Sequence, residues 1–489
     1  MKIFSIFTKR DSKAQTSTVQ ASELARIQAQ IFESALPPKR LEAYFSDATD
    51  EYADVITQEA TLRQMRANSR KVYLNEGTSN HGAFISGIHA TGGKGPSLRI
   101  ISAKEKGRGG SDPTAPELSE EEREHIEWEW YYFSEAIDLT EHIRQAVEAL
   151  QFDGELFFRM VYDPEIEDVQ FNLEQIEAKR VRFPIEGETH PNIVGGILFK
   201  GLHPKSFFVI PKTLNPNFDW NWQAVQVPAC DMIHFFIPRL PDQHRGMPWM
   251  QSVLNDIAET SIYEQYHLGA ANAAARNSGG VVECPADAAV GQKIELQPTY
   301  TAPNPGEIKQ LLPGLTYKQG SANWPTSNYG PYIESKREKH AAGMQLTKAM
   351  LTNNFEKHNY SSFRGEMIVY WEVVSFIRQR LEKMVLNRVF ERFMECLAAV
   401  DDIAAEIVKK YQFRLSRIPR YWVWPPIPAY DMEAQVKALS TAMAAGFMSR
   451  KMCIEALGKD FEQVETDRKE DDFAQDSGSG GIQPDRQKV

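Results

Sequence analysis

Residues 351–366 read LTNNFEKHNYSSFRGE, a short polar stretch that leads directly into a long amphipathic pattern. The segment before it, Glu334 to Met350, has no proline and only Gly343 as a weak point, so it predicts a helix. The polar stretch offers amide, ammonium and imidazole donors without an opposing acidic cluster: Asn353, Asn354, Lys357, His358 and Asn359. This pattern suits a loop held against a polyanion, and it also fits an ordinary surface connection between two helices.

A second helix is expected after the polar stretch, from Ser361 to about Leu397. Ser361 or Ser362 can cap its first turn. Its apolar side chains recur at helical spacing: Val369, Val373, Phe376, Ile377, Leu381, Met384, Val389 and Phe393. The pattern covers about 37 residues, roughly 55 Å of helix. Because helices in globular proteins average about 11–12 residues, a helix of this length is expected to span a whole assembly.

The rest of the sequence predicts helices towards both ends of the chain and strands between them. Helical patterns occupy 21–74, with a break at Pro37-Pro38, then 80–91, and they resume after Ser119, where three glutamates favour a helix start. Residues 104–116 are typical of a loop. Short runs rich in β-branched and aromatic residues predict strands at 156–162, 169–173, 193–199, 207–210 and 232–237. Two final helices are expected at 432–445 and 449–457, so the fold class is predicted to be α+β.

Another helix is predicted to begin at Pro248 and to continue to about residue 278. Its last part carries almost no bulky side chains, and the packing candidates there are Gly269, Ala270, Ala271 and Ala274. Small residues let two helices approach closely, either between neighbouring subunits or at a tight crossing within one core. Residues 279–332, which follow, are rich in Pro, Gly and Asn and are interpreted as an insertion. The next predicted helix has a mixed charged face with the basic residues Lys336, Arg337, Lys339 and Lys348.

Composition limits the possible functions. The chain has 489 residues, 42% of them hydrophobic, and a formal net charge of −11 from 55 basic and 66 acidic residues. A generic nucleic-acid-coating protein would be basic. The four cysteines are far apart, form no CxxC pair and are interpreted as reduced thiols. No apolar run approaches the length of a membrane span, so no membrane partner is expected.

Catalytic and metal-binding motifs are weak throughout. The glycines and lysine at residues 92–95 lack the spacing of a phosphate-binding loop. His81 and His89 are eight residues apart and have no HExxH partner, and Glu165, Glu167 and Asp168 are typical of a turn. There is also no GxSxG motif. The sequence therefore predicts no enzyme, no metal and no cofactor.

Four segments, in the same order along the chain, resemble the lambda-type bacteriophage portal proteins. The run Asn359-Tyr-Ser-Ser362, followed by an Arg and a Glu, is similar to the tunnel-loop segment of that family. The others are residues 66–70 with 93–99, residues 227–236 with 245–249, and a C-terminal set at 424–428, 431, 446–449 and 458–460. Together they cover roughly residues 65–465. Acidic Glu76 departs from the family pattern, and the clip region is not recognisable in detail.

The resemblance implies a portal fold with long stem and wing helices, a small β-rich wing module and an inserted clip. Its expected parts are an N-terminal helical part of the wing (1–150), the β-rich module (151–247), a first stem helix (248–278), the clip (279–332), a second stem helix (333–350), the tunnel loop (351–360), a long wing helix (361–400), a C-terminal wing and crown (401–470) and a disordered tail (471–489). The five polar residues of the tunnel loop named above would face DNA, and the four basic stem residues would be possible channel-lining residues.

The resemblance also implies function and partners. Portal proteins form a ring, expected to be a dodecamer, at one capsid vertex of the virion, and they assemble in the host cytoplasm. Double-stranded DNA passes through the central channel, and the expected protein partners are the terminase large subunit, the major capsid protein and a head–tail connector or adaptor. An acidic channel wall would keep DNA from sticking. Two alternatives stay open: a nucleic-acid-processing enzyme with an unrecognised site, and a different ring-forming head–tail adaptor.

Overall fold

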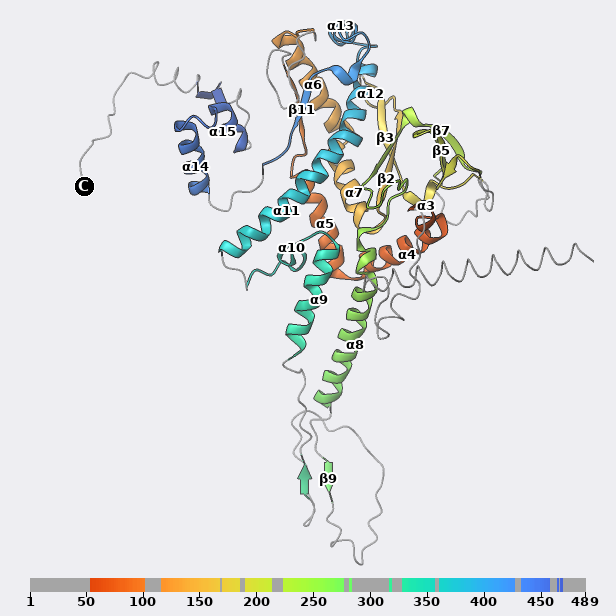
Figure 1. Cartoon of the computed structure of the whole chain (residues 1–489), viewed down its shortest axis with the longest axis vertical. Helices are drawn as coiled ribbons and strands as arrows, with labels where there is room; N and C mark the ends of the chain where they lie inside the picture. Colours follow the sequence, from red (N-terminus) through yellow and green to blue (C-terminus); the bar gives the residue numbers. More distant parts are fainter. Residues whose placement is uncertain are drawn as a thin grey trace, which may run out of the picture. The chain divides into compact units, whose positions relative to one another are not determined.

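The structure, a computed structural model, describes residues 53–101, 116–167, 169–184, 190–212, 223–276, 281–283, 316–318, 328–356, 360–426, 432–457, 464–465 and 467–468. The chain divides into two compact units, residues 1–56 and 57–489. Of the first unit only the short helix α3 (Ala53–Ile56) is described. Figure 1 labels the helices and strands along the chain, and all contacts given below lie within the second unit. The predicted helical pattern before residue 53 and the predicted disordered tail, 471–489, lie outside the described residues.

A single capping residue separates the first two helices of this unit. Glu76 lies between α4 (Glu59–Asn75) and α5 (Gly77–Thr91). Its carboxylate accepts hydrogen bonds from the backbone N–H groups of Thr78 and Ser79, at 3.2 and 2.6 Å. Such an acceptor satisfies N–H groups that have no partner within the first turn of a helix. The acidic residue that departs from the family pattern therefore starts α5, three residues earlier than predicted.

The next two helices, α6 (Glu120–Ala136) and α7 (Leu139–Phe152), form a pair. The start of α6 is a capping box: Ser119 Oγ accepts from the Glu122 N–H at 3.1 Å, and the Glu122 carboxylate accepts from the Ser119 N–H at 2.9 Å. This confirms the helix start predicted from the acidic run after Ser119.

The strands form small antiparallel sheets. The two larger sheets have the strand orders β3-β2-β8 and β4-β5-β6-β7, and two further pairs are β1-β11 and β9-β10. Their bounds are β1 (Ser97–Ile100), β2 (Glu155–Tyr162), β3 (Phe171–Ile176), β4 (Ile193–Val194), β5 (Ile197–Lys200), β6 (His203–Val209), β7 (Val225–Pro228), β8 (Met232–Phe236), β9 (Val281–Glu283), β10 (Thr316–Lys318) and β11 (Arg420–Val423). The β9-β10 pair lies in the segment interpreted as an insertion.

Two features of the sheets differ from the predictions. Residues 193–199 were expected to be one strand, but Gly195 and Gly196 have φ angles of 53° and 84° and turn the chain back between β4 and β5. A Cβ at Gly196 would also lie 2.6 Å from the backbone nitrogen of Arg182, so this turn requires glycine. The second difference is the pairing of β1 with β11, in which Leu98 lies opposite Trp422. Neither of these two segments was among the strands predicted from the sequence.

Three clusters of buried side chains hold the unit together. The central core joins α6 and α7 to the β3-β2-β8 sheet and to the long helix that spans residues 360–397. In this core the ring centroid of Trp130 lies 5.2 Å from those of both Phe393 and Trp422. The stem-side core contains Ala83, Met250, Ala341, Met344, Leu346, Leu351, Met367, Tyr370, Trp371 and Val374. The sheet core lies on the four-stranded sheet and contains Phe157, Ile176, Val181, Ile197, Phe207, Val209, Val227 and Met232.

The long helix predicted at 361–397 is present, with one irregularity. It consists of α11 (Tyr360–Leu381), a π-helical turn (Glu382–Leu386, η5) and α12 (Asn387–Leu397). A π turn inserts one extra residue and rotates the helix that follows. Met367, Tyr370, Trp371 and Val374 of α11 contribute to the stem-side core, whereas Ile377 and Leu381 near its end, and Phe390 and Phe393 after the turn, belong to the central core.

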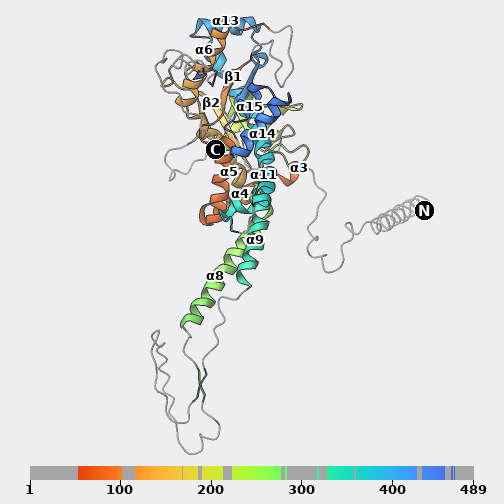
Figure 2. The same ribbon diagram turned by 90° about the vertical axis from the view of Figure 1, so that its left-hand side faces the viewer.

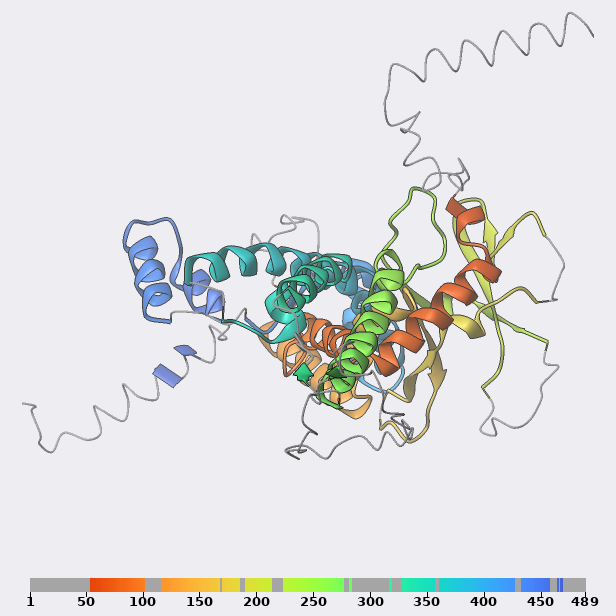
Figure 3. The same ribbon diagram turned by 90° about the horizontal axis from the view of Figure 1, so that it is seen from below.

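The two helices interpreted as the stem lie side by side, as Figures 1 and 2 show. α8 (Leu254–Arg276) follows a 3-10 turn at Trp249–Ser252 (η3), so the regular helix begins later than the predicted residue 248. The view from below in Figure 3 shows α8 beside α4. The second stem helix, α9 (Tyr329–Gly343), returns along α8.

The prediction of one helix from 334 to 350 is wrong at its C-terminal end. α9 stops at Gly343, and a separate short helix, α10 (Lys348–Thr352), follows. A Cβ at Gly343 would lie 2.4 Å from Val253, so α9 crosses η3 too closely for any other residue. Gln345 then has a φ of 59°, and the Thr347 side chain caps α10 through the Met350 N–H. The buried Met344 carbonyl left by the break accepts a hydrogen bond from Gln151 at 3.0 Å.

The C-terminal helices agree with the predicted ranges. They are α14 (Met432–Ala444) and α15 (Arg450–Ala456), which pack on each other, whereas α13 (Asp402–Lys410), which precedes them, was not predicted. Within the residues described, none of the helices combines the length and the apolar character that crossing a membrane requires.

Candidate functional site

One carboxylate joins α8 and α9, the two helices interpreted as the stem. Asp256 Oδ1 on α8 accepts from Lys336 Nζ at 2.7 Å and from Lys339 Nζ at 3.1 Å, and Oδ2 lies 2.9 Å from His340 Nε2. Burial acts to raise the pKa of Asp256, but the hydrogen bonds from these three groups outweigh it and lower the pKa to about 2. Burial lowers the pKa of His340 in spite of its carboxylate neighbour. This group of side chains, the Asp256 clamp, therefore fixes α9 against α8.

The predicted channel-lining residues are all engaged within the chain. Lys336 and Lys339 bind Asp256, and the other two contact glutamates: Arg337 lies 4.0 Å from Glu264, and Lys348 lies 2.9 Å from Glu338. Each of the four side chains thus has a carboxylate within ion-pair distance. Whether any of them faces DNA stays a prediction, but their positive charge is partly neutralised where they lie.

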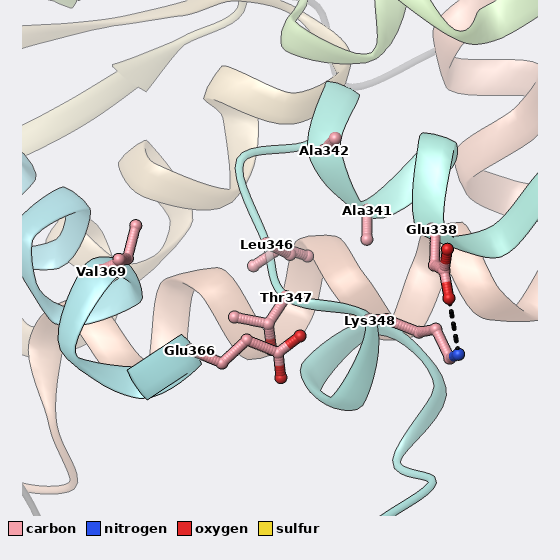
Figure 4. Close-up of a pocket in the computed structure, with 8 residues that line it drawn as sticks. All are labelled: Glu338, Ala341, Ala342, Leu346, Thr347, Lys348, Glu366 and Val369. Atoms are coloured by element: carbon pink, nitrogen blue, oxygen red, sulfur yellow. Dashed lines mark hydrogen bonds and ion pairs between the residues drawn. The ribbon is translucent and has the colours of Figure 1, made fainter. Parts of the chain in front are cut away.

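A groove lies beside the break between α9 and α10, between these helices and the start of α11 (Figure 4). Its volume is about 340 Å³, and its lining is partly apolar and partly charged: Glu338, Ala341, Ala342, Leu346, Thr347, Lys348, Glu366 and Val369. The Glu338–Lys348 ion pair spans one end of it, and Glu334 lies 3.8 Å from the same ammonium. The hydrogen bond to Glu338 is the main reason that the pKa of Lys348 is raised. The Glu338–Lys348 ion pair thus connects α10 to α9 across the break between them.

The polar segment after α10 begins with a left-handed residue. Asn353 ends α10 with a φ of 51°, a conformation that asparagine tolerates better than most residues. Asn354 Oδ1 accepts from the Glu356 N–H at 3.0 Å, which is a local turn, and both asparagines are exposed. The ring of Phe355 packs edge-on against Phe363 of α11, with centroids 5.4 Å apart. The other predicted DNA-facing residues, Lys357, His358 and Asn359, lie outside the described residues.

The small-residue part of α8 has little packed against it. A Cβ added at Gly269 would meet no described atom within 4 Å, and Ala270 and Ala271 are half-buried. The side chain of Ala274 lies outside the description. Nearby side chains of the same helix are strongly exposed, with Tyr266 at 75% and Leu268 at 62%. This part of α8 therefore leaves space for a neighbouring helix.

One buried ionic group, centred on Glu155, was not predicted from the sequence. The Glu155 carboxylate is completely buried at the start of β2, with Arg66 Nη2 and Arg245 Nη2 each at 2.6 Å and His234 Nε2 at 2.8 Å. The Gly246 N–H donates to the same carboxylate at 2.7 Å. Burial acts to raise the pKa of Glu155, but Arg245 and Arg66 hold it far below its usual range.

The arrangement brings the quoted sequence motifs together. Arg66 belongs to the segment 66–70, while His234 and Arg245 belong to 227–236 and 245–249, and all three contact Glu155. Arg70, which is half-buried, forms a second pair with the buried Asp153, with its Nη2 2.6 Å from that carboxylate. The missed signal was the pair of carboxylates at 153 and 155, between a helix and an apolar strand. These motifs stabilise the fold, since they join α4 to β2 and β8.

One pH dependence follows from the Asp256 clamp. The pKa of Asp256 is lowered from its ordinary 3.8 to about 2, so its contribution to stability is complete above about pH 4 and is lost as the pH falls towards 2. Between pH 5 and pH 3, urea unfolding should therefore show a smaller loss of unfolding free energy for Asp256→Asn than for the unmodified chain. Glu338→Gln, whose side chain is 61% exposed, is the control and should keep the original dependence. An identical loss in Asp256→Asn and the unmodified chain would contradict this.

The described residues contain no group of three or more His, Cys, Asp and Glu side chains that could hold a metal ion. The features gathered here are instead a clamped pair of long helices, a charged groove and a polar segment that leads into a helix continuous from residue 360 to 397.

Solved structures similar to this chain come from gene transfer agent (GTA) particles. The neck of an empty GTA particle computed with C6 symmetry contains a chain that is 14% identical, with a TM-score of 0.45, covering 81% of this chain and 94% of that one. For the neck of the native particle computed with C12 symmetry the identity is 15% and the TM-score 0.39, with 65% and 80% covered. For the virion of the native particle the values are 13% and 0.43, with 86% and 98% covered.

No curated protein sequence matches the chain. A family model does, over residues 38–378, and its description is phage portal protein, lambda family. The matched range includes three of the four segments that carried the resemblance, the Asp256 clamp, the Glu155 group and the polar segment after α10. The chain belongs to the lambda family of phage portal proteins.

Proposed function

We propose that this chain is one subunit of a ring, a dodecamer, that surrounds a channel at one vertex of a capsid. Double-stranded DNA passes through the channel during packaging and again at ejection. The observation that carries the proposal is the family match over residues 38–378, because it contains both stem helices and the polar segment between α10 and α11. The small-residue part of α8 supports ring formation, since the open space beside Gly269 leaves room for the same helix of a neighbouring subunit.

The polar segment is proposed to be the part of the subunit that touches DNA. It offers amides at Asn353, Asn354 and Asn359 and positive or imidazole groups at Lys357 and His358. A ring repeats each of these residues around its axis, so that one side chain per subunit becomes a belt of donors. Contacts of this kind to phosphates are independent of base sequence and weaken with salt.

The charge distribution supports weak rather than tight contact with DNA. The formal net charge of the chain is −11, and the stem lysines Lys336 and Lys339 share the carboxylate of Asp256. Four basic residues are proposed to line the channel: Lys336, Arg337, Lys339 and Lys348. Nearby carboxylates partly neutralise their positive charge. A duplex that must move through the ring is guided by such a wall without being held.

The remaining parts of the subunit are proposed to serve docking. Residues 279–332 form the clip, which meets the terminase large subunit during packaging and the head–tail connector or adaptor afterwards. The wing, built from residues 1–150, 151–247 and 361–400, meets the major capsid protein, and residues 401–470 complete the wing and crown. The ring assembles in the host cytoplasm and stays in the virion. In this proposal the subunit supplies geometry and performs no bond chemistry.

The test is whether the purified chain forms closed rings without DNA or nucleotide. Negative-stain microscopy should show particles with a central hole, and Ala271→Phe should lower the yield of such rings by about tenfold or more, because a large side chain prevents close approach of neighbouring helices. Ala271→Ser, which keeps the side chain small, is the matched control and should leave the yield unchanged. If the unmodified chain stays monomeric, the proposed function is wrong. If both variants form rings as the unmodified chain does, only the role of this part of α8 is wrong.

A further inference from the structure

The exposed face of α6 carries an unusual combination of side chains. Trp128, Tyr131 and Tyr132 are 58%, 51% and 62% exposed. Their rings touch one another: the centroid of Trp128 lies 5.9 Å from that of Tyr131 and 6.0 Å from that of Tyr132, and the two tyrosines are 5.7 Å apart. Monomeric surfaces seldom leave such a cluster in water, and Trp and Tyr are the residues enriched at the centres of protein interfaces.

Carboxylates lie at both ends of this cluster on the same helix face. Exposed positions recur at helical spacing, and together they form what we name the aromatic–acidic stripe: Glu121, Glu124, Trp128, Tyr131, Tyr132 and Glu135. Within the described part of the chain, none of these three glutamates takes part in an ion pair, whereas Glu122 and Glu127 of the same helix bind Lys410 and Arg99. The stripe is therefore suited to a partner that presents an apolar side chain flanked by positive charge.

The β5–β6 turn of the same chain has the complementary chemistry. Lys200 pairs with His203 across a two-residue turn in which Gly201 has a φ of 64° and Leu202 is 93% exposed. Lys200, His203 and Lys205 are exposed as well, and no ion pair between the described residues involves either lysine. The turn thus presents a protruding leucine between two ammonium groups, and no acidic residue lies between positions 190 and 212.

The two features belong to different parts of the unit. The buried face of α6 contributes to the central core, whereas β5 and β6 contribute to the sheet core. One copy can therefore offer its stripe to one neighbour and its turn to another, which is a head-to-tail contact. Contacts of that type produce closed rings when the rotation between copies closes.

We propose that the aromatic–acidic stripe of one subunit binds the β5–β6 turn of the next. Leu202 packs on the three aromatic rings, and Lys200 and Lys205 lie against Glu124 and Glu135. The inference rests on the proposed ring and adds to it a wing-to-wing contact outside the stem. The chemistry also predicts strong dependence on ionic strength, because the charged pairs lie at the edge of the contact.

Photo-crosslinking tests this contact directly. A benzophenone amino acid replaces Trp128 in the full-length chain, copies labelled with heavy isotopes are mixed with unlabelled ones, and crosslinked peptides from purified rings are identified by mass spectrometry. We expect crosslinks to residues 200–205, with mixed isotope labels that identify two different copies. The same probe at Tyr162, an aromatic position that is more exposed at 73%, is the control and should not reach that turn.

Charge reversal supplies the second arm of the experiment. Two double variants should each lower the ring yield by about tenfold: one combines Glu124→Lys with Glu135→Lys, and the other combines Lys200→Glu with Lys205→Glu. The chain that carries all four changes should restore the original ring yield. Glu165→Lys, at an exposed position outside the stripe, is the charge control, and circular dichroism confirms that each variant folds.

Each result decides a different claim. Absence of rings from the unmodified chain overturns both the proposed function and this contact. Rings whose Trp128 probe crosslinks elsewhere, to another protein or to its own copy, overturn the contact alone, as does a failure of the four-change chain to recover assembly.

Discussion

Glu155→Ala is expected to lower the free energy of unfolding by about 3–5 kcal/mol, which is the usual cost of removing one partner from a buried ion pair. Glu155 is completely buried and is the shared acceptor for Arg66, Arg245 and the Gly246 N–H. Without it, two guanidinium groups stay in the interior with their charges uncompensated. Urea unfolding of the purified protein, followed by circular dichroism, measures the change.

A matched control lies on the neighbouring strand. Glu174 of β3 also binds an arginine, Arg180 at 3.0 Å, but its side chain is 29% exposed. Glu174→Ala should therefore cost no more than about 1 kcal/mol, because water replaces part of the lost interaction. Equal effects of the two substitutions would mean that the Glu155 group is no more important for folding than a surface pair.

Lys357→Glu is expected to abolish or strongly shorten DNA packaging while leaving ring formation intact. The proposed ring repeats residue 357 in every subunit, so the substitution replaces a belt of positive charge by a belt of negative charge facing the phosphates. The measurement is the length of DNA packaged per particle, together with its retention after purification. Microscopy of the same preparation establishes whether the rings are normal.

The conservative variant separates charge from other effects at this position. Lys357→Arg keeps the positive charge and should package DNA of normal length. Full-length, stably retained DNA in Lys357→Glu particles would exclude the polar segment from any role in moving or holding DNA. Loss of packaging in both variants would point instead to a requirement for lysine itself, and the charge argument would be wrong.

Local patterns in the sequence were sufficient for most helices. The periodic stripe from Val369 to Phe393 gave the long helix almost to its ends, and Ser119 with Glu122 marked the start of α6. These signals succeed because helix hydrogen bonds and caps join residues three or four apart.

Features that depend on distant residues were not accessible in this way. Gly343, the last residue of α9, packs too closely against Val253 for a larger side chain, and Val253 lies about 90 positions earlier in the sequence. The β1-β11 pair places Leu98 opposite Trp422, and neither segment carries a local sequence signal that identifies its partner strand. The four basic residues of this region were recognised from the sequence, but Asp256, which binds two of them, was not. Its partner Lys336 lies 80 positions later in the sequence, so no local pattern connects the two residues. Local spacing patterns predict contacts between residues close in the sequence, whereas these contacts join residues that are far apart and meet only in the folded chain.

The long helix from Tyr360 to Leu397 belongs to two cores at once. Its first half supplies Met367, Tyr370, Trp371 and Val374 to the stem-side core, and its second half supplies Phe390 and Phe393 to the central core. If either half unwinds, the other loses the continuous hydrogen-bond ladder that supports it, so the two cores cannot open independently. We therefore expect a single cooperative unit, in which amide protons on both sides of the π turn exchange with solvent through openings of the same free energy.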